Sequence, residues 1–487
     1  MSKTSFISLV LLFCSLQISS IQEIAQAQTP GIQITPTKSI CPSQLSSAIN
    51  NITNSSQFNR GRWGILVKTL LSDKILYNQD AQKYFIPASN IKLFTTAAAL
   101  QQLGADFRIR TSVYDDGNGV FRVVGRGDPS FTNAQLTILA KQLYQQGIRQ
   151  INHLIADDSY FQGSVVNYSW EWEDIQADYG APVNSLILNE NRSILTLSPQ
   201  SMGQPLQIKW ADPTEAYRWR IENNTTTTEV NESAFIEINR DLKGQILEIK
   251  GQMPISSQPE MSAVAVFDPG IHFLRKFRQY LGREGINVEE NLNTNIINNA
   301  REIAAVESPP LSELLIETNL NSNNLYAEAL LRSLGIKKPR EKNQNTADIG
   351  LQIVRETLTE LGIETDGYII VDGSGLSRKN LTTPAALVQV LEVMAKSSQA
   401  EIFRASLPVA GIKGSLKNRF LKTAAEGIVQ GKTGSMTGIS ALSGYVNAPN
   451  YEPLVFSIMV NQSTQPGKVM RTAIDEIVVL LARLGQC

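Results

Sequence analysis

The sequence predicts a mixed α/β fold of the α+β type, in which helices flank an antiparallel sheet and a large strand-rich domain or domain pair is inserted. A chain of 487 residues with 42% hydrophobic residues is long enough for two or three domains. Helix-type and strand-type apolar patterns occur together in both outer parts of the chain, whereas residues 109–305 are dominated by alternating strands. A sheet packed between helices accounts for the two outer parts.

The first part of the sheet-containing domain is predicted over residues 28–108. In residues 61–80, two apolar runs flank a short polar turn, which is typical of a β-hairpin. A helix follows from about Ser89, because residues 92–103 are good helix formers with apolar side chains at helical spacing, and Gly104 is a stop signal.

The inserted part is predicted over residues 109–305. Its start has the alternating pattern of strands in 108–116 and 119–127, followed by a helical pattern in 133–147. The polar stretch "NNTTTTEVNES" (223–233) is expected to form an exposed loop.

The second part of the sheet-containing domain is predicted over residues 306–487. Helical patterns come first, strand patterns follow, and a helix closes the chain. The helices are expected within 308–335, 347–362, 383–398 and 471–485, and the strands within 426–436, 439–448 and 454–463.

The N-terminus has the pattern of an export signal over residues 1–27. Lys3 supplies a positive charge, residues 6–16 form an apolar segment, and Ala25-Gln26-Ala27 is a small-x-small cleavage site. The apolar segment is much shorter than the roughly 20 residues that span a bilayer. We therefore expect a protein secreted across the inner membrane into the periplasm or cell envelope, without a transmembrane anchor.

Two cysteines remain after removal of the signal, Cys41 and Cys487. An exported protein is exposed to conditions in which disulfides form. The sequence leaves two alternatives open, a disulfide that ties the two ends together and a pair of unrelated free thiols.

Charge and residue usage exclude several function classes. The 44 Lys and Arg residues balance 45 Asp and Glu residues, which argues against nucleic acid or an anionic membrane as a partner. The chain has two histidines, His153 and His272, neither near an obvious nucleophile, so a Ser-His-Asp triad and a zinc site are both improbable. Phosphate-binding glycine patterns are absent. No metal and no cofactor is expected, and an enzyme would have to move protons without imidazole.

Ser89 and Lys92 could do this proton chemistry. Residues at i and i+3 share a helix face, which brings the lysine amine within reach of the serine hydroxyl. A lysine amine held among apolar neighbours or other cations has a lowered pKa and can accept the serine proton. Taken alone, the pair is better explained as a helix-capping serine followed by a solvated lysine.

Two further patterns change this interpretation. Ser322-Asn323-Asn324 lies at a turn that enters a helix, and Lys432-Thr433-Gly434-Ser435 follows a strand pattern. Each alone has an ordinary structural explanation, a capping turn and a loop-to-strand lysine. Together and in this order they match the set Ser-x-x-Lys, Ser-x-Asn and Lys-Thr-Gly of serine β-lactamases and penicillin-binding proteins.

With these residues the sequence resembles the class C low-molecular-mass penicillin-binding proteins, the D-alanyl-D-alanine carboxypeptidases/endopeptidases. The resemblance covers nearly the whole mature chain and includes a long insertion, since about 230 residues separate Ser89 from Ser322. It implies the fold of serine β-lactamases and transpeptidases for the sheet-containing domain. Further similar stretches are "GRGDPSF" (125–131), "YGAPVNSLILNEN" (179–191), "VDGSGLSRKNLTTP" (371–384) and "SLPVAGIKGSLKNRF" (406–420).

The resemblance implies a role for each matching residue. Ser89 would be the acylated nucleophile, Lys92 would remove its proton, and Ser322 would relay a proton to the departing amine. The substrate-binding residues would be Asn324 for a backbone amide, Lys432 and Thr433 for the terminal carboxylate, Gly434 for close approach, and Ser435 for the oxyanion.

The function implied is an exported serine D-Ala-D-Ala carboxypeptidase or D,D-endopeptidase that acts on peptidoglycan stem peptides and is acylated by β-lactams. Two alternatives remain, a β-lactamase or esterase on the same motifs and a non-catalytic wall-binding protein. The sequence does not decide the balance of the two peptidase activities, the stem-peptide diamino acid, the oligomeric state or the role of the insertion.

Several residues near the motifs are expected to contribute to the structure of the site. Arg378 is expected either to shape the site or to cap a surface loop, and Asp372, Ser374 and Ser377 to support the site structurally. The aromatic stretch "YSWEWEDIQADYG" (168–180) is better explained as a local packing cluster than as a sugar-binding cleft.

Overall fold

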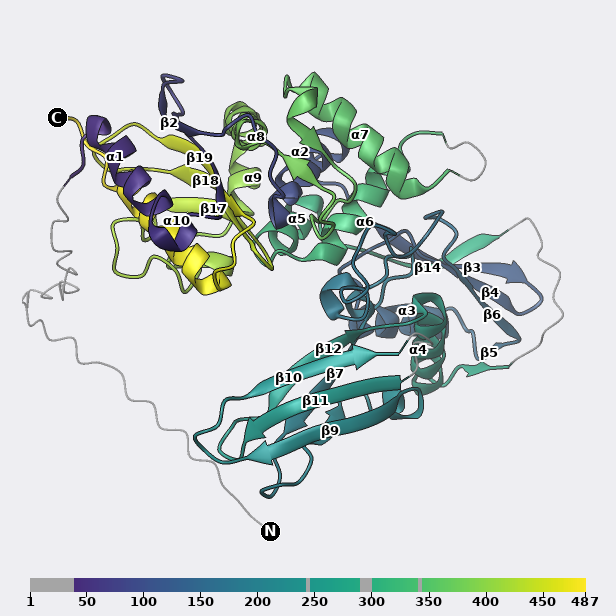
Figure 1. Ribbon diagram of the computed structural model, residues 1–487. Coiled ribbons are helices and arrows are strands. Elements are labelled where there is room, and N and C mark those ends of the chain that lie inside the picture. The colour runs from purple at the N-terminus through teal and green to yellow at the C-terminus, as the bar shows by residue number, and fades with distance from the viewer. Residues whose placement is uncertain (1–38, 242–245, 290–299, 340–343) are drawn as a thin grey trace, which may run out of the picture. The chain divides into compact units, whose positions relative to one another are not determined.

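The computed structural model describes residues 39–241, 246–289, 300–339 and 344–487, and residues 38–487 form one compact unit (Figure 1). The predicted export signal, residues 1–27, lies outside the described residues.

The central sheet has five strands in the order β17-β18-β19-β1-β2, and every neighbouring pair is antiparallel. Both β18 and β19 are buried at every residue, which explains why their sequences are almost continuously apolar. β17 is an outer strand of this sheet. The strands are β1 (Arg62–Thr69), β2 (Ile75–Gln79), β17 (Val429–Met436), β18 (Ile439–Val446) and β19 (Leu454–Asn461).

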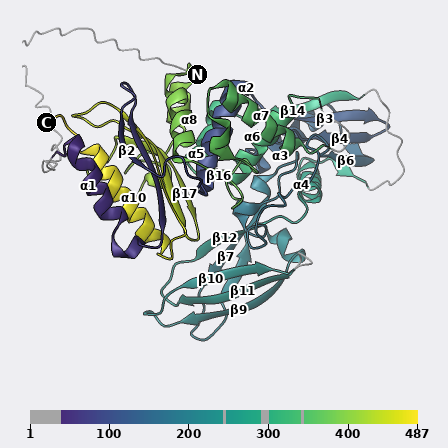
Figure 2. The same cartoon turned by 45° about the horizontal axis from the view of Figure 1, so that its top comes forward.

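Helices cover both faces of the central sheet (Figures 1 and 2). α1 (Pro42–Thr53) and α10 (Gly467–Ala482) lie side by side on one face, and α8 (Pro384–Lys396) packs on the other. Successive side chains of a strand point to opposite faces of the sheet. On β1, Ile65 and Val67 pack toward α1 and α10, whereas Leu66 belongs to the core on the other face.

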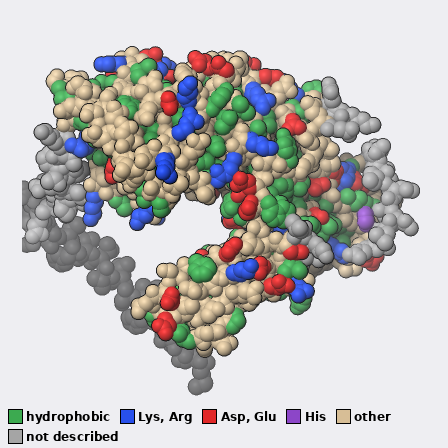
Figure 3. Space-filling model, viewed as in Figure 1, with side chains coloured by type: hydrophobic (Ala, Val, Ile, Leu, Met, Phe, Trp, Pro, Cys, Tyr) green, Lys and Arg blue, Asp and Glu red, His purple; other side chains and the backbone are tan. Residues whose placement is uncertain are grey.

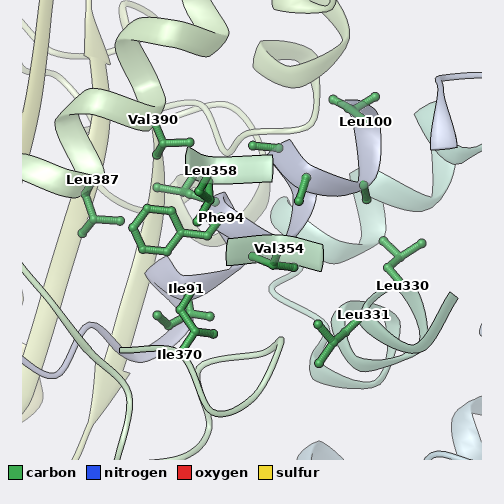
Figure 4. Packing of buried hydrophobic residues seen from close by; sticks show 14 of the residues in the cluster. Ile91, Phe94, Leu100, Leu330, Leu331, Val354, Leu358, Ile370, Leu387 and Val390 are labelled. Atoms are coloured by element: carbon green, nitrogen blue, oxygen red, sulfur yellow. The ribbon is translucent and has the colours of Figure 1, made fainter. Parts of the chain in front are cut away.

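The core on the α8 side is formed by helices that come from distant parts of the sequence. Figure 4 shows Phe94 of α2 beside Leu358 of α7 and Leu387 of α8, all of them fully buried. Burial of each such side chain contributes about 1.5–3 kcal/mol. These contacts hold α2 among the surrounding helices. The remaining helices of this part are α2 (Lys92–Leu103), α5 (Leu311–Asn319), α6 (Asn324–Gly335), α7 (Thr346–Glu360) and α9 (Ala400–Ala405), with a small pair β15 (Tyr368–Ile369) and β16 (Leu381–Thr382).

The inserted residues build separate sheets with cores of their own. A four-stranded sheet has the order β14-β3-β4-β6, and two three-stranded sheets have the orders β12-β7-β8 and β10-β11-β9. The elements are β3 (Arg110–Gly117), β4 (Val120–Val124), α3 (Asn133–Gln145), β5 (Gln150–Ile151), β6 (His153–Asp157), β7 (Arg192–Ser198), β8 (Gln207–Trp210), β9 (Arg220–Thr228), β10 (Phe235–Arg240), β11 (Ile246–Pro254), β12 (Glu260–Ala265), α4 (Pro269–Arg283), β13 (Asn287–Val288) and β14 (Arg301–Glu307).

The predicted loop over 223–233 is wrong for its first half. Residues 223–228 belong to β9, which pairs in parallel with β11, and only the residues after Thr228 form a turn. Thr225 and Thr227 are buried in this strand. Threonine is β-branched and favours strands, so the run of threonines outweighed the polarity that suggested a loop.

The other main elements agree with the sequence prediction. The fold class, an antiparallel sheet flanked by helices with a strand-rich insertion, is confirmed, and the early hairpin joins the central sheet as β1 and β2. The exact domain limits at residues 108/109 and 305/306 stay a prediction. Cys41 and Cys487 form a disulfide with a Cα–Cα distance of 5.8 Å, which ties the start of α1 to the residues after α10.

The surface carries charges of both signs. Cationic and anionic side chains are interspersed on the face shown in Figure 3. Among the helices of the described ranges, none combines the length and the apolar character needed to cross a membrane.

Candidate active site

Ser89 lies on a 3₁₀ turn, Ala88–Ile91, that leads directly into α2. Side chains three residues apart eclipse one another in a 3₁₀ turn, so Lys92 comes to lie over Ser89. The Lys92 Nζ to Ser89 Oγ distance is 3.0 Å. The capping alternative for Ser89 is not seen, since the α-helix proper begins at Lys92.

The turn that carries Ser89 is fixed from both sides. Ala88 has a positive φ of 48°, which is unusual for a residue with a side chain. Asn90 is fully buried and donates from Nδ2 to Ser443 Oγ on β18 at 3.0 Å. The packed sheet therefore holds a strained backbone conformation next to the predicted nucleophile.

Lys92 is completely buried and donates to three oxygen atoms. These are Ser89 Oγ at 3.0 Å, Asn324 Oδ1 at 2.6 Å and the Ser374 carbonyl at 2.6 Å. Burial lowers the pKa of Lys92 from 10.5 to about 7, and the negative charges of Asp372 and Glu328 oppose part of this decrease. A substantial fraction of the amine is therefore neutral near pH 7 and able to accept a proton.

Ser322 and Lys432 form a second serine–lysine contact. Ser322 occupies a turn with a φ of 59°, and its Oγ accepts from Lys432 Nζ at 2.7 Å. Lys432, on β17, is fully buried, and both burial and the charge of Lys92 hold its pKa well below the usual value. Because each lysine disfavours the cation on the other, a neutral Lys92 favours a charged Lys432.

Asn324 is the first residue of α6, and both polar atoms of its side chain are hydrogen-bonded within the protein. Its Oδ1 accepts from Lys92, and its Nδ2 donates to the Tyr179 carbonyl at 2.9 Å. The helix start is stabilised by the preceding Asn323, whose side chain accepts from the Tyr326 amide. A substrate that used the Asn324 amide would have to share or replace the Tyr179 contact.

The outer strand β17 approaches the nucleophile closely at Gly434. A Cβ atom there would lie 2.5 Å from the Pro87 carbonyl oxygen and 3.3 Å from the Ser89 nitrogen. Thr433 Oγ1 lies 2.7 Å from Ser415 Oγ, a contact that the sequence did not suggest. Ser435 follows on the same strand and is exposed. Glycine is required at 434 because no side chain fits between the two backbones.

The segment 372–377 closes the other side of Ser89, as its predicted supporting role requires. Gly375 has a φ of 80°, and a Cβ atom there would lie 2.0 Å from the Ala88 carbonyl oxygen. Asp372 organises the segment, since its carboxylate accepts from the amides of Gly375 and Ser377, both at 2.7 Å. It also accepts from the buried Trp170 indole at 3.0 Å.

A cavity of about 850 Å³ opens above these residues. Ser89, Ser322, Asn324 and Ser435 line it, whereas Lys92 and Lys432 lie buried beneath. The inserted residues and the 375–378 turn supply much of the remaining wall. The other lining residues are Ala88, Glu171, Glu173, Asp174, Tyr179, Gly375, Leu376, Arg378, Met436 and Thr437.

The aromatic stretch 168–180 and Arg378 both belong to this cavity. Trp170 is buried and contacts the distant Asp372, while the acidic side chains of the same stretch reach the cavity wall. Arg378 donates to Glu171 Oε2 at 3.0 Å, so it shapes the site and joins it to the insertion.

The two histidines lie away from the nucleophile, in the insertion. His272, on α4, is buried beside Arg275 and Glu215, with its Nδ1 3.1 Å from Arg275 Nη2. In the part of the chain that the structure describes, no group of three or more His, Cys, Asp or Glu residues is placed to hold a metal ion.

The chain is similar to several known proteins. Residues 45–484 match the model of the D-Ala-D-Ala carboxypeptidase 3 (S13) family. A D-alanyl-D-alanine carboxypeptidase of Actinomadura sp. (strain R39) is 33% identical over 86% of this chain and 81% of that protein. A penicillin-sensitive carboxypeptidase A of Dictyostelium discoideum is 30% identical over 90% of this chain and 91% of that protein. The crystal structure of penicillin binding protein 4 from Haemophilus influenzae has the same fold, with a TM-score of 0.76 and 24% identity over 89% of this chain and 98% of that one.

Proposed function

The chain belongs to the D-Ala-D-Ala carboxypeptidase 3 (S13) family of serine peptidases, and on this premise we propose that Ser89 is the residue acylated by the substrate. The observation that carries the proposal is the position of Lys92, whose amine lies 3.0 Å from Ser89 Oγ. A residue with a pKa near the working pH is best suited to general base catalysis. Lys92, with a pKa of about 7, has this property.

The proposed acylation step couples a proton transfer to nucleophilic attack on the substrate carbonyl. Lys92 Nζ takes the proton of the Ser89 hydroxyl as Oγ forms a bond to the carbonyl carbon of the penultimate D-Ala. The carbonyl oxygen becomes an oxyanion, which the backbone amides of Ser89 and Ser435 would stabilise. When the tetrahedral intermediate collapses, the C–N bond breaks, and the proton that Lys92 took passes through Ser322 to the leaving amine, which leaves Lys92 neutral again. Water later hydrolyses the Ser89 ester, which releases the shortened peptide as its carboxylic acid and restores the Ser89 hydroxyl.

The substrate class we propose is the peptidoglycan stem peptide that ends in D-Ala-D-Ala. Lys432 would bind the terminal carboxylate together with Thr433, since a buried cation next to a polar hydroxyl suits a carboxylate. Gly434 would let the peptide lie along the outer strand β17, which has β18 as its neighbour in the central sheet. Asn324 would contact the substrate backbone after its Nδ2 leaves the Tyr179 carbonyl.

Penicillin binding follows from the same chemistry. The β-lactam amide is attacked like a peptide bond, but its amine stays tethered to the acyl group and hinders the approach of water. We therefore expect a slowly hydrolysed adduct, and we propose that the enzyme acts in the periplasm or cell envelope, where its substrate lies.

Incubation with two substrates tests the proposed function and compares carboxypeptidase with endopeptidase activity. We expect wild-type protein to release D-Ala from a linear pentapeptide, to convert a cross-linked muropeptide dimer to monomers, or to do both, and Ser89→Ala to do neither. The ratio of D-Ala to monomer measures carboxypeptidase against endopeptidase activity. Failure of folded wild-type protein to form either product, or rapid turnover of nitrocefin, would contradict the proposal, and the latter result would favour a β-lactamase.

A further inference from the structure

Glu328 is a buried carboxylate on α6, one helical turn after Asn324. Its exposed fraction is 1%, and all residues of α6 from Leu325 to Gly335 are buried. Residues four apart on a helix lie on the same face, so Glu328 and Asn324 point to the same side. A buried carboxylate is costly unless its oxygens are paired.

The partners of Glu328 lie in the turn beside the nucleophile. Oε1 accepts from the Gly373 amide at 2.8 Å and from the Ser374 amide at 2.9 Å. Oε2 pairs with Arg332 Nη1 at 3.2 Å. Thr95 of α2 donates from Oγ1 to the Gly373 carbonyl at 2.7 Å. One carboxylate and one hydroxyl therefore fix the two peptide groups that directly precede the Ser374 carbonyl. The peptide group of that carbonyl itself is held by Asp372, which accepts from the Gly375 amide at 2.7 Å.

This turn sets the direction in which Lys92 can act as a base. A neutral amine has two N–H groups and one lone pair. Asn324 Oδ1 and the Ser374 carbonyl, each 2.6 Å from Lys92 Nζ, accept both N–H groups. Ser89 Oγ is the third neighbour, at 3.0 Å, so the lone pair faces the serine hydroxyl. Displacement of the Ser374 carbonyl would leave the lone pair without a fixed direction.

The charges around Lys92 come from four other residues. Asp372 and Glu328 favour its ammonium form. The charge of Lys92 lowers the pKa of Lys432, and because repulsion between two cations is mutual, a charged Lys432 disfavours the ammonium form of Lys92. Arg332 is the counter-ion of Glu328 and weakens its influence. Burial and the charge of Asp372 raise the pKa of Glu328, whereas Arg332 and the two amides favour its carboxylate. Loss of the carboxylate charge would therefore stabilise the neutral amine of Lys92.

We propose that Glu328 is a positioning residue for acylation, which holds the Ser374 carbonyl against Lys92 and so directs the lone pair of Lys92 at Ser89. The proposal rests on the roles of Ser89 and Lys92 proposed above. A residue that only stabilises the fold would affect melting temperature and yield, but not the pH profile or the acylation rate of folded protein.

Two substitutions test the charge of Glu328 and the length of its side chain separately. Glu328→Gln retains an oxygen that accepts from both amides but removes the charge. The acid limb is the part of the pH profile in which the acylation rate rises as Lys92 loses its proton. In Glu328→Gln this limb should move to lower pH, by about half a unit or more. Glu328→Asp retains the charge but is one methylene shorter. Its acid limb should stay in the wild-type position, while the plateau rate should fall about tenfold or more because the turn is released.

The probe is benzylpenicillin, and the readout is the rate of adduct formation per folded molecule between pH 5 and 9, by intact mass. Glu356→Gln, which removes a half-buried carboxylate of α7 paired with Lys338, is the matched control and should behave as wild type. Thr95→Val removes the other tether of the same turn with little change in shape. It should lower the plateau without moving the limb, and it decides the question if the Glu328 variants do not fold.

The outcomes distinguish this inference from the proposed function. A wild-type plateau for Glu328→Asp, or an unmoved limb for Glu328→Gln, would overturn the inference while the function stands. If neither variant folds, a wild-type plateau for Thr95→Val would overturn it. If wild-type protein itself forms no adduct, the proposed function fails, and the positioning role fails with it.

Discussion

Replacement of Lys92 with methionine is expected to lower the rate of acylation by penicillin by about 10²–10⁴-fold, the usual contribution of a general base. Methionine fills a similar volume but cannot accept the Ser89 proton. The wild-type rate should rise with pH through about pH 7, as Lys92 loses its proton, and the variant should lack this limb. Lys468→Met, an exposed substitution on α10, is the control and should keep both the rate and the limb. An unchanged limb in Lys92→Met would assign the pH dependence to another group.

Lys92→Met should also change how the stability of the folded protein depends on pH. The pKa of Lys92 is about 7 in the folded protein, below the 10.5 of an unperturbed lysine. Between these values the unfolded chain binds more protons, so this group makes wild-type stability rise as pH increases from about 7 to 10.5. Methionine removes this dependence. The melting temperature of Lys92→Met relative to wild type should therefore be more favourable at pH 6 than at pH 10.

Replacement of Lys432 with methionine should remove the preference for a free terminal carboxylate. A hydrogen bond between charged groups contributes about 1.5–3 kcal/mol, and loss of a buried partner costs more, so kcat/KM for a D-Ala-D-Ala peptide should fall about 10²-fold. The same peptide with a terminal amide should be a poor substrate for both proteins. The measurement is kcat/KM for the acid and the amide with wild type, Lys432→Met and the control Lys468→Met.

Two results would contradict carboxylate recognition by Lys432. If wild-type protein cleaves the amide as fast as the acid, Lys432 does not recognise a carboxylate. If Lys432→Met loses activity equally on both peptides, the lysine acts on the proton relay through Ser322, which it contacts at 2.7 Å, and not on substrate recognition.

The sequence predicted the parts of the site that depend on local patterns. Helical spacing placed Lys92 at the start of α2, and a turn before an apolar helix placed Ser322 and Asn324 at the start of α6. The set of three motifs suggested that these segments meet, and the structure brings Ser89, Lys92 and Asn324 together.

What the sequence did not predict comes from contacts between distant segments. The Ser374 and Tyr179 carbonyls carry no side-chain signal, because every residue has a carbonyl. Ser415 meets Thr433 only through the folding of a turn against β17. One signal was available for Glu328: a carboxylate within a mainly apolar helix, four residues after Asn324, needs a buried partner.

The insertion was harder to predict because its strands are polar. The predicted loop over 223–233 includes the second part of β9, and the stretch 168–180 is predicted as a packing cluster. Trp170 is buried but contacts the distant Asp372, and Glu171, Glu173 and Asp174 reach the cavity wall. Local sequence cannot separate these two roles within one short stretch, since adjacent residues point in different directions.

The central claim is that Ser89 is the acylated residue, and the mass of the protein after incubation with benzylpenicillin tests it most directly. Wild-type protein and Ser201→Ala, an exposed serine outside the site, should each gain the mass of one penicillin. Proteolytic mapping should place the adduct on Ser89, and Ser89→Ala should gain nothing. A wild-type protein that gains no mass, or an adduct that persists in Ser89→Ala, would contradict the account.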